Sequence, residues 1–150
     1  MDDATQQRRI EFFSARCREL GVPFTAQRRA VLEAVLALDR HPTADQVHER
    51  VVESLPEVNR ATVYRTLETL VACGAVTKLS HPGRAVRYDP RTDRHHHLIC
   101  SRCDEVMDLD DEHFDTIPIP DTTALGFTVA DLCVQLRGLC ENCRNKEASP

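Results

Sequence analysis

Apolar residues recur at helical spacing through the first half of the chain. The pattern predicts four helices, over residues 8–20, 26–38, 44–55 and 60–73. Thr25 and Thr43 stand at N-cap positions of the second and third helices, and Asn59 precedes the fourth. Gly21 and Gly74 follow the first and fourth helices, as expected at C-termini.

Residues 75–89 change from helical to alternating character. They predict two short strands joined by a turn at 81–84, whose sequence is HPGR. Short helices followed by a β-hairpin are typical of a winged helix-turn-helix domain.

The predicted fourth helix has two faces at 100° per residue. The apolar sector holds Val63, Tyr64, Leu67, Leu70 and Val71, and the polar sector holds Thr62, Arg65, Thr66, Glu68 and Thr69. With Arg60 in the first turn, short hydroxyls and arginine suit the DNA major groove, where arginine pairs with guanine and threonine reaches phosphates. A solvated face on an ordinary surface helix explains the same pattern.

The second half reads differently. HHHLIC (95–100) and EVMDL (105–109) predict strands around a tight CSRC turn, and residues 110–117 predict a short helix that Pro118 and Pro120 stop. Residues 126–140 predict one long strand ending in CENC. The fold class is therefore α+β, with a winged-helix domain at 1–88 and a small α/β domain at 89–150.

Charge divides at the same place. Residues 1–88 carry 13 basic and 11 acidic side chains, a balance of +2, whereas residues 89–150 carry 6 and 13, a balance of −7. A polyanion is therefore expected to bind the first half. No segment approaches the roughly 18 apolar residues of a membrane span, and the polar N-terminus does not resemble a signal peptide, so we expect a cytoplasmic protein without a membrane partner.

Four of the seven cysteines form two CxxC pairs, Cys100 with Cys103 and Cys140 with Cys143. Each CxxC turn places two thiolates at adjacent corners of a tetrahedron, so two turns predict a closed structural zinc site. Four reduced thiols or a redox CxxC are the alternatives. Cys17, Cys73 and Cys133 lack such partners and lie in apolar patterns, which favours packed thiols.

A second group of possible ligands surrounds the histidine run. In a strand, His95 and His97 share the face opposite His96. Asp89 lies upstream, Asp108 follows the next strand, and His41 lies between two helices of the first half. A mixed nitrogen and oxygen set suits ferrous iron, manganese or zinc, and it would connect the two halves. Solvated polar residues on an acidic surface are the alternative.

The chain resembles the ferric uptake regulator family over nearly its full length. The matching segments are FTAQRRAVLEAVL, HPTADQVHERV, NRATVYRTLETL, VRYDPRTDRHHHLICSRCDEVMDL and LRGLCENC. The resemblance implies a homodimeric repressor of operator DNA, with a winged-helix domain and a dimerisation domain that contains a four-cysteine zinc site. It assigns structural zinc to Cys100, Cys103, Cys140 and Cys143, and a regulatory Fe(II), Mn(II) or Zn(II) to His41, Asp89, His95, His97 and Asp108.

The resemblance also bears on DNA contacts and on the signal. It implies DNA contacts from Arg60, Thr62, Tyr64 and Arg65, although the helical wheel places Tyr64 in the apolar sector. Asp108 matches the peroxide-sensing branch, because iron-sensing members more often carry glutamate there. In that branch, iron and hydrogen peroxide oxidise a ligand histidine, matching His41 or His95, and the operator is released.

The sequence departs from the family at Leu132, where many members carry a histidine of an additional metal site. His96, Asp131, Glu112 and His113 lie near, but the resemblance does not supply a third site.

Three alternatives remain. An iron, manganese, zinc or nickel sensor of the same family would use the same residues. A mononuclear iron enzyme would need open metal positions and turnover, although the resemblance implies no enzyme and no small-molecule substrate beyond metal ions and peroxide. A zinc-containing interaction module would bind DNA independently of Asp108.

Overall fold

The computed structural model describes residues 3–38, 40–80 and 84–147. The chain forms two compact units, Met1–Thr92 and Asp93–Pro150. The division falls a few residues after the one predicted from sequence, so Asp89 belongs to the first unit. Within the described residues, no helix is long and apolar enough to cross a membrane.

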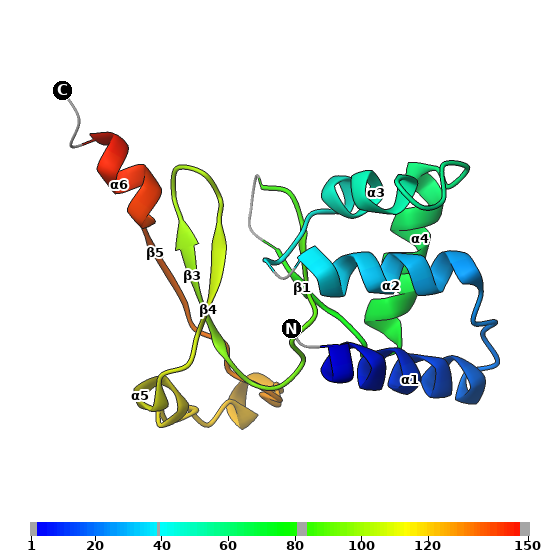
Figure 1. The fold of residues 1–150 in the computed structure, drawn as a ribbon. Coiled ribbons are helices and arrows are strands. Elements are labelled where there is room, and N and C mark those ends of the chain that lie inside the picture. The colour runs from blue at the N-terminus through cyan, green and yellow to red at the C-terminus, as the bar shows by residue number, and fades with distance from the viewer. Residues whose placement is uncertain (1–2, 39, 81–83, 148–150) are drawn as a thin grey trace. The chain divides into compact units, whose positions relative to one another are not determined.

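The first unit contains four helices and a two-stranded hairpin (Figure 1). The helices are α1 (Asp3–Glu19), α2 (Ala26–Leu38), α3 (Ala44–Val52) and α4 (Arg60–Ala72), and the antiparallel strands are β1 (Thr77–Leu79) and β2 (Arg87–Asp89). The hairpin predicted from the sequence is present, whereas most of its predicted turn, residues 81–83, lies outside the described residues.

Local signals in the sequence explain where these helices begin. The Thr25 hydroxyl accepts the backbone N–H of Arg28 at 3.2 Å. Thr43 and Gln46 form a reciprocal capping box at the start of α3. The Asn59 side chain accepts the N–H of Thr62 at 2.9 Å at the start of α4. The predicted capping roles of Thr25 and Thr43 are therefore confirmed.

One apolar core holds the first unit together. It takes Phe13 and Cys17 from α1, Leu32 and Val35 from α2, and Val47 from α3, among other side chains. Because α2, α3 and α4 all contribute to this core, the position of α4 is set by packing along its length. The expectation that Cys17 and Cys73 are packed thiols is confirmed, since both are buried here.

The second unit is built on a three-stranded sheet in the order β4-β3-β5. Strand β3 (His96–Cys100) pairs antiparallel with β4 (Val106–Leu109) and parallel with β5 (Gln135–Gly138). The remaining elements are α5 (Glu112–Asp115), the 3-10 helix η1 (Thr123–Leu125) and α6 (Glu141–Glu147).

Two elements of this unit differ from what the sequence indicated. The strand expected over 126–140 is reduced to the four residues of β5, because only those residues pair with β3. Helix α6 follows Cys140 and was not predicted, since its polar sequence ENCRNKE has no apolar period. It matters for the site because Cys140 immediately precedes it and Cys143 lies in its first turn.

Candidate metal centres

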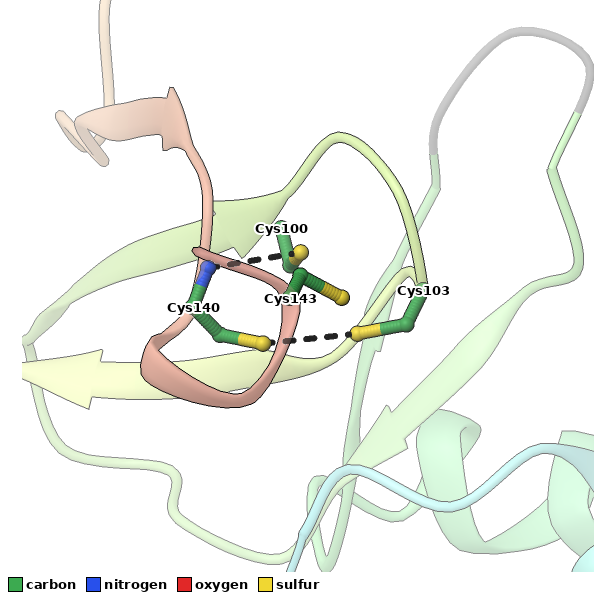
Figure 2. A group of neighbouring side chains, drawn as sticks. All are labelled: Cys100, Cys103, Cys140 and Cys143. Carbon is green, nitrogen blue, oxygen red and sulfur yellow. Dashed lines mark hydrogen bonds between the residues drawn. The ribbon is translucent and has the colours of Figure 1, made fainter. Parts of the chain in front are cut away.

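The two CxxC pairs meet in the second unit (Figure 2). Cys100 ends β3 and Cys103 lies in the turn to β4, whereas Cys140 precedes α6 and Cys143 lies in its first turn. Their four sulfur atoms lie within 4.8 Å of one another. The predicted grouping of these four cysteines is therefore present, across a separation of 36 residues.

Backbone and side-chain hydrogen bonds hold the two CxxC segments next to each other. Asp104 adopts a left-handed φ of 59° and donates its N–H to the Cys100 carbonyl at 3.0 Å, which closes the first turn. Arg102 links the turns by donating to the Cys143 carbonyl at 3.0 Å. The Cys140 N–H donates to the Cys100 sulfur at 3.4 Å.

The donor set fits zinc. A tetrahedral site with Zn–S bonds of about 2.3 Å separates its sulfur atoms by about 3.8 Å. The Cys103 and Cys140 sulfur atoms lie 3.7 Å apart. A disulfide would require about 2.0 Å, so these two thiols are reduced, and their spacing matches that of two ligands in a tetrahedral zinc site.

The thiols of this cluster differ in acidity. Backbone N–H groups, that of Cys140 foremost, lower the pKa of the Cys100 thiol to about 6. Burial and then the neighbouring thiols raise the pKa of the Cys143 thiol to about 12. The two directions differ because Cys100 accepts backbone N–H groups that stabilise its thiolate, whereas Cys143 is buried beside the other thiols.

The five residues predicted for the second metal divide between the units. His41 and Asp89 lie in the first unit, where His41 Nε2 is 3.4 Å from Asp89 Oδ2. Residues 41–43 run beside β2: Tyr88 donates its N–H to the Pro42 carbonyl at 2.9 Å, and Arg87 donates to the His41 carbonyl at 3.0 Å. His41 adopts a left-handed φ of 45°, which is uncommon for a residue with a side chain. Strain of this kind collects at functional sites.

The other three residues lie together in the second unit. His97 is opposite Asp108 in the β3–β4 ladder. His95 Nε2 lies 3.4 Å from Asp108 Oδ1, and the rings of His95 and His97 are 4.5 Å apart. One donor atom of each of these three residues lies within 4.8 Å of the others. Two imidazoles and one carboxylate therefore converge on one face of the strand.

His96 points to the opposite face, as the alternation of a strand predicts. Its Nδ1 accepts the Val134 N–H at 3.2 Å, its ring packs edge-on against Phe114, and its Nε2 lies 3.4 Å from Asp115 Oδ1. Arg94 also pairs with Asp115, at 3.2 Å. His96 joins neither group of converging ligands found among the described residues, and the same holds for Glu112, His113 and Asp131.

The exposure of side chains on α4 differs in part from what the helical wheel predicted. Tyr64 is 47% exposed, and Thr66 is buried at 5%, so the wheel was wrong about both side chains. Arg60 is exposed and pairs with Asp45 at 3.1 Å. Arg65 is exposed and lies 3.4 Å from the Thr62 hydroxyl. The four residues predicted to contact DNA thus include three that are well exposed and one, Thr62, that is half-buried.

Cys133 is a residue whose role the sequence did not reveal. Its apolar surroundings in the sequence predicted a packed thiol, but the side chain is exposed. Its sulfur lies 3.5 Å from Nδ1 of His97. No periodic pattern could have indicated this contact, because the residues are far apart in sequence and meet only through the pairing of β5 with β3.

Comparison with known proteins gives a consistent result. The sequence pattern of the ferric uptake regulator family matches residues 19–137. The peroxide-responsive repressor PerR of Staphylococcus saprophyticus is 29% identical over 142 residues, which cover 95% of this chain and 96% of the relative.

Solved structures agree on the fold. The Helicobacter pylori ferric uptake regulator Fur superposes with a TM-score of 0.75 at 15% identity, covering 93% of each chain. A zinc uptake regulator complexed with zinc and DNA gives a TM-score of 0.67 at 25% identity, covering 96% of this chain and 98% of that one. The predicted α+β class, with a winged-helix domain followed by a small α/β domain that carries four clustered cysteines, is confirmed.

Proposed function

The chain belongs to the ferric uptake regulator family, and from this membership we propose that it is a metal-dependent transcriptional repressor that responds to hydrogen peroxide. The observation that carries the proposal is the carboxylate beside the paired histidines. Asp108 faces both His95 and His97, and its short side chain is the feature that matched the peroxide-sensing branch. The similarity to a PerR repressor points in the same direction.

The regulatory metal is proposed to bind His41, Asp89, His95, His97 and Asp108. Each unit contributes imidazole and carboxylate donors, a combination that suits Fe(II) or Mn(II), with Zn(II) also able to bind. Because the ligands come from both units, binding would couple them and favour one arrangement for holding DNA. Iron, when bound, supplies the redox chemistry by which peroxide oxidises a nearby imidazole.

The oxidised residue is proposed to be His41 or His95. Both present Nε2 toward a carboxylate, at 3.4 Å from Asp89 and Asp108 respectively. Addition of oxygen to the ring removes a good donor from a site that depends on all its ligands, so metal affinity falls and the operator is released.

The four-cysteine cluster is assigned a separate role, which is to hold structural zinc. With four thiolate ligands, no position remains open for substrate or water. It therefore stabilises the second unit and is not expected to respond to peroxide in the same way as the regulatory site.

Double-stranded operator DNA is proposed to contact α4 through Arg60, Thr62, Tyr64 and Arg65. Arginine and threonine reach phosphates and base edges, and Tyr64 presents a ring to the groove. The first unit carries the positive balance of the chain, which favours a polyanion. Binding to a chromosomal operator would place the protein in the cytoplasm.

A homodimer is proposed to form through the second unit. Met107, Leu136 and Leu139 are each 41% to 42% exposed around β4 and β5, and Phe127 is 63% exposed. Met107, Leu136 and Leu139 also line a small pocket of about 140 Å³, bounded partly by Leu98 and Arg137. A second copy of the chain would cover this apolar surface and complete a core that the isolated unit lacks.

The experiment compares operator binding by the Fe(II) and Mn(II) forms before and after one equivalent of hydrogen peroxide. Mass spectrometry of the peptides containing His41 and His95 follows oxidation. We expect only the Fe(II) form to release DNA and to gain an oxygen atom on a histidine. Asp108→Glu is expected to keep repression and lose peroxide sensitivity.

Other results would identify other functions. If both metal forms stay bound and unmodified, the protein is a metal-level sensor of the same family. If metal has no effect on DNA binding, the metal-dependent repressor is refuted. Steady-state consumption of an organic substrate with dioxygen would indicate a mononuclear iron enzyme instead.

A further inference from the structure

His95 and His97, the two histidines beside Asp108, each have a polar group next to the ring nitrogen Nδ1. His95 Nδ1 lies 2.8 Å from the Asp93 carbonyl, while its Nε2 faces Asp108. His97 Nδ1 lies 3.5 Å from the sulfur of Cys133. In metal sites, the second ring nitrogen usually donates its proton to such an outer partner, which fixes the tautomer and the ring orientation.

The position of Cys133 is determined by the backbone. The His97 N–H donates to the Val134 carbonyl at 3.0 Å, and the Val134 N–H donates to His96 Nδ1 at 3.2 Å. Strand β5 then continues parallel to β3, with Gln135 in register with His97. The segment that carries Cys133 is therefore hydrogen-bonded to His96 and His97. This pairing brings the Cys133 sulfur into contact with the His97 ring.

The two outer partners differ in chemistry. The Asp93 partner is a backbone carbonyl, which no substitution removes and which cannot be modified. The Cys133 partner is an exposed thiol, and sulfur is a weak hydrogen-bond acceptor whose accepting ability depends on its chemical state. One imidazole thus has a permanent outer partner and the other has a partner open to solvent.

We propose that Cys133 is a positioning residue for the regulatory metal: its sulfur accepts the Nδ1–H of His97 and holds Nε2 ready to bind. This inference rests on the proposed metal-binding role of His97. It makes metal affinity depend on an exposed thiol that lies outside the five ligands and outside the zinc cluster. Blocking or replacing that thiol weakens the regulatory site while the fold stays intact.

The test uses the full-length zinc-containing protein without regulatory metal. Nitrogen-15 NMR of the histidine rings reports which nitrogen of His97 carries the proton. Mn(II) titration reports affinity. The variants are Cys133→Ala and Cys133→Ser. Cys133→Ala removes the hydrogen-bond acceptor, whereas Cys133→Ser replaces the sulfur with a hydroxyl oxygen, which also accepts but has a shorter bond to Cβ. Gln135→Ala is the matched control, because Gln135 is exposed on the same segment and opposite His97.

We expect His97 to be protonated at Nδ1 in the wild type and to lose this preference in Cys133→Ala. Mn(II) affinity should fall about tenfold in Cys133→Ala, at the lower end of the effect of outer partners, because sulfur accepts weakly. Cys133→Ser should recover part of the loss, and Gln135→Ala should behave as wild type. Zinc content should be unchanged in all three.

Two results would overturn the proposal: a wild-type His97 that carries its proton on Nε2, or a Cys133→Ala protein with wild-type tautomer and Mn(II) affinity. Failure of the proposed function looks different. In that case His95→Ala would not reduce Mn(II) affinity, yet the NMR measurement would still show whether Cys133 sets the His97 tautomer.

Discussion

Replacing one zinc ligand should unfold the second unit and leave the first unit folded. The second unit has little apolar core of its own: the buried apolar side chains described there are Ile99 and Val106 together with Cys100, Cys140 and Cys143. The first unit, by contrast, has a continuous core drawn from all four helices. Small domains with so little buried apolar surface depend on a metal or a cross-link.

The size of the effect follows from the loop that the zinc closes. The 36 residues between Cys103 and Cys140 are constrained when both CxxC turns bind one ion. Closing a loop of this length lowers the entropy of the unfolded chain by an amount worth about 4 kcal/mol in the treatment used for disulfides. Zinc binding in small domains is worth on the order of 10–16 kcal/mol at neutral pH, so the loop term is a lower bound.

Cys140→Ser is the substitution, and hydrogen exchange followed by mass spectrometry is the assay. A loss of about 4 kcal/mol corresponds to roughly a thousandfold rise in the open population, so β3 and β5 amides should exchange at least that much faster. Peptides from α2 provide the internal reference and should be unchanged.

Cys133→Ser is the matched control, because its thiol is exposed and lies outside the zinc cluster. It should retain zinc and wild-type exchange in β3. If Cys140→Ser also exchanges like the wild type after losing its zinc, the second unit is stable without the metal, and the reasoning from its small core is refuted.

Three further predictions concern the first unit and the regulatory ligands. His95→Ala should keep zinc and the wild-type circular dichroism spectrum but lose Mn(II)-dependent operator binding in a mobility-shift assay; retained Mn(II) dependence would exclude His95 as a ligand. Arg65→Gln should weaken binding and reduce the slope of log affinity against log salt by about 0.9 for each phosphate that Arg65 neutralises; an unchanged slope would show that Arg65 neutralises no phosphate. Asn59→Ala removes the hydrogen bond to the Thr62 N–H and should destabilise the first unit by about 1 kcal/mol in urea unfolding, whereas the exposed Glu57→Ala, outside any helix, should have little effect.

Several features could be predicted from the sequence because they depend on near neighbours. Helix α2 begins and ends where its apolar period and Thr25 indicated. Each CxxC pair is a local turn, and the doubled spacing implied that the pairs meet. The alternation of His95, His96 and His97 between two faces followed from strand geometry alone.

The α4 surface shows where such reasoning stops. Tyr64 was assigned to the buried face and Thr66 to the exposed face, and both assignments were wrong. A helical wheel uses only the angular position and the type of each residue. What decides exposure is which face of α4 the rest of the unit covers. The resemblance to the family, which placed Tyr64 among the contacts to DNA, drew on information that periodicity does not contain.

The sequence by itself therefore determined the order of the helices in the first unit, the grouping of the four cysteines and the identity of the possible metal ligands. It did not determine that α1 begins as early as Asp3 or that α3 ends at Val52. Only the tertiary structure decided that β5 is short, that α6 begins directly after Cys140 and contains Cys143, and that the Cys133 sulfur lies against His97. The physical reason is the range of the interactions: caps, turns and periodicity act over a few residues, whereas the partner of His97 is brought to it by strand pairing across 36 positions of chain.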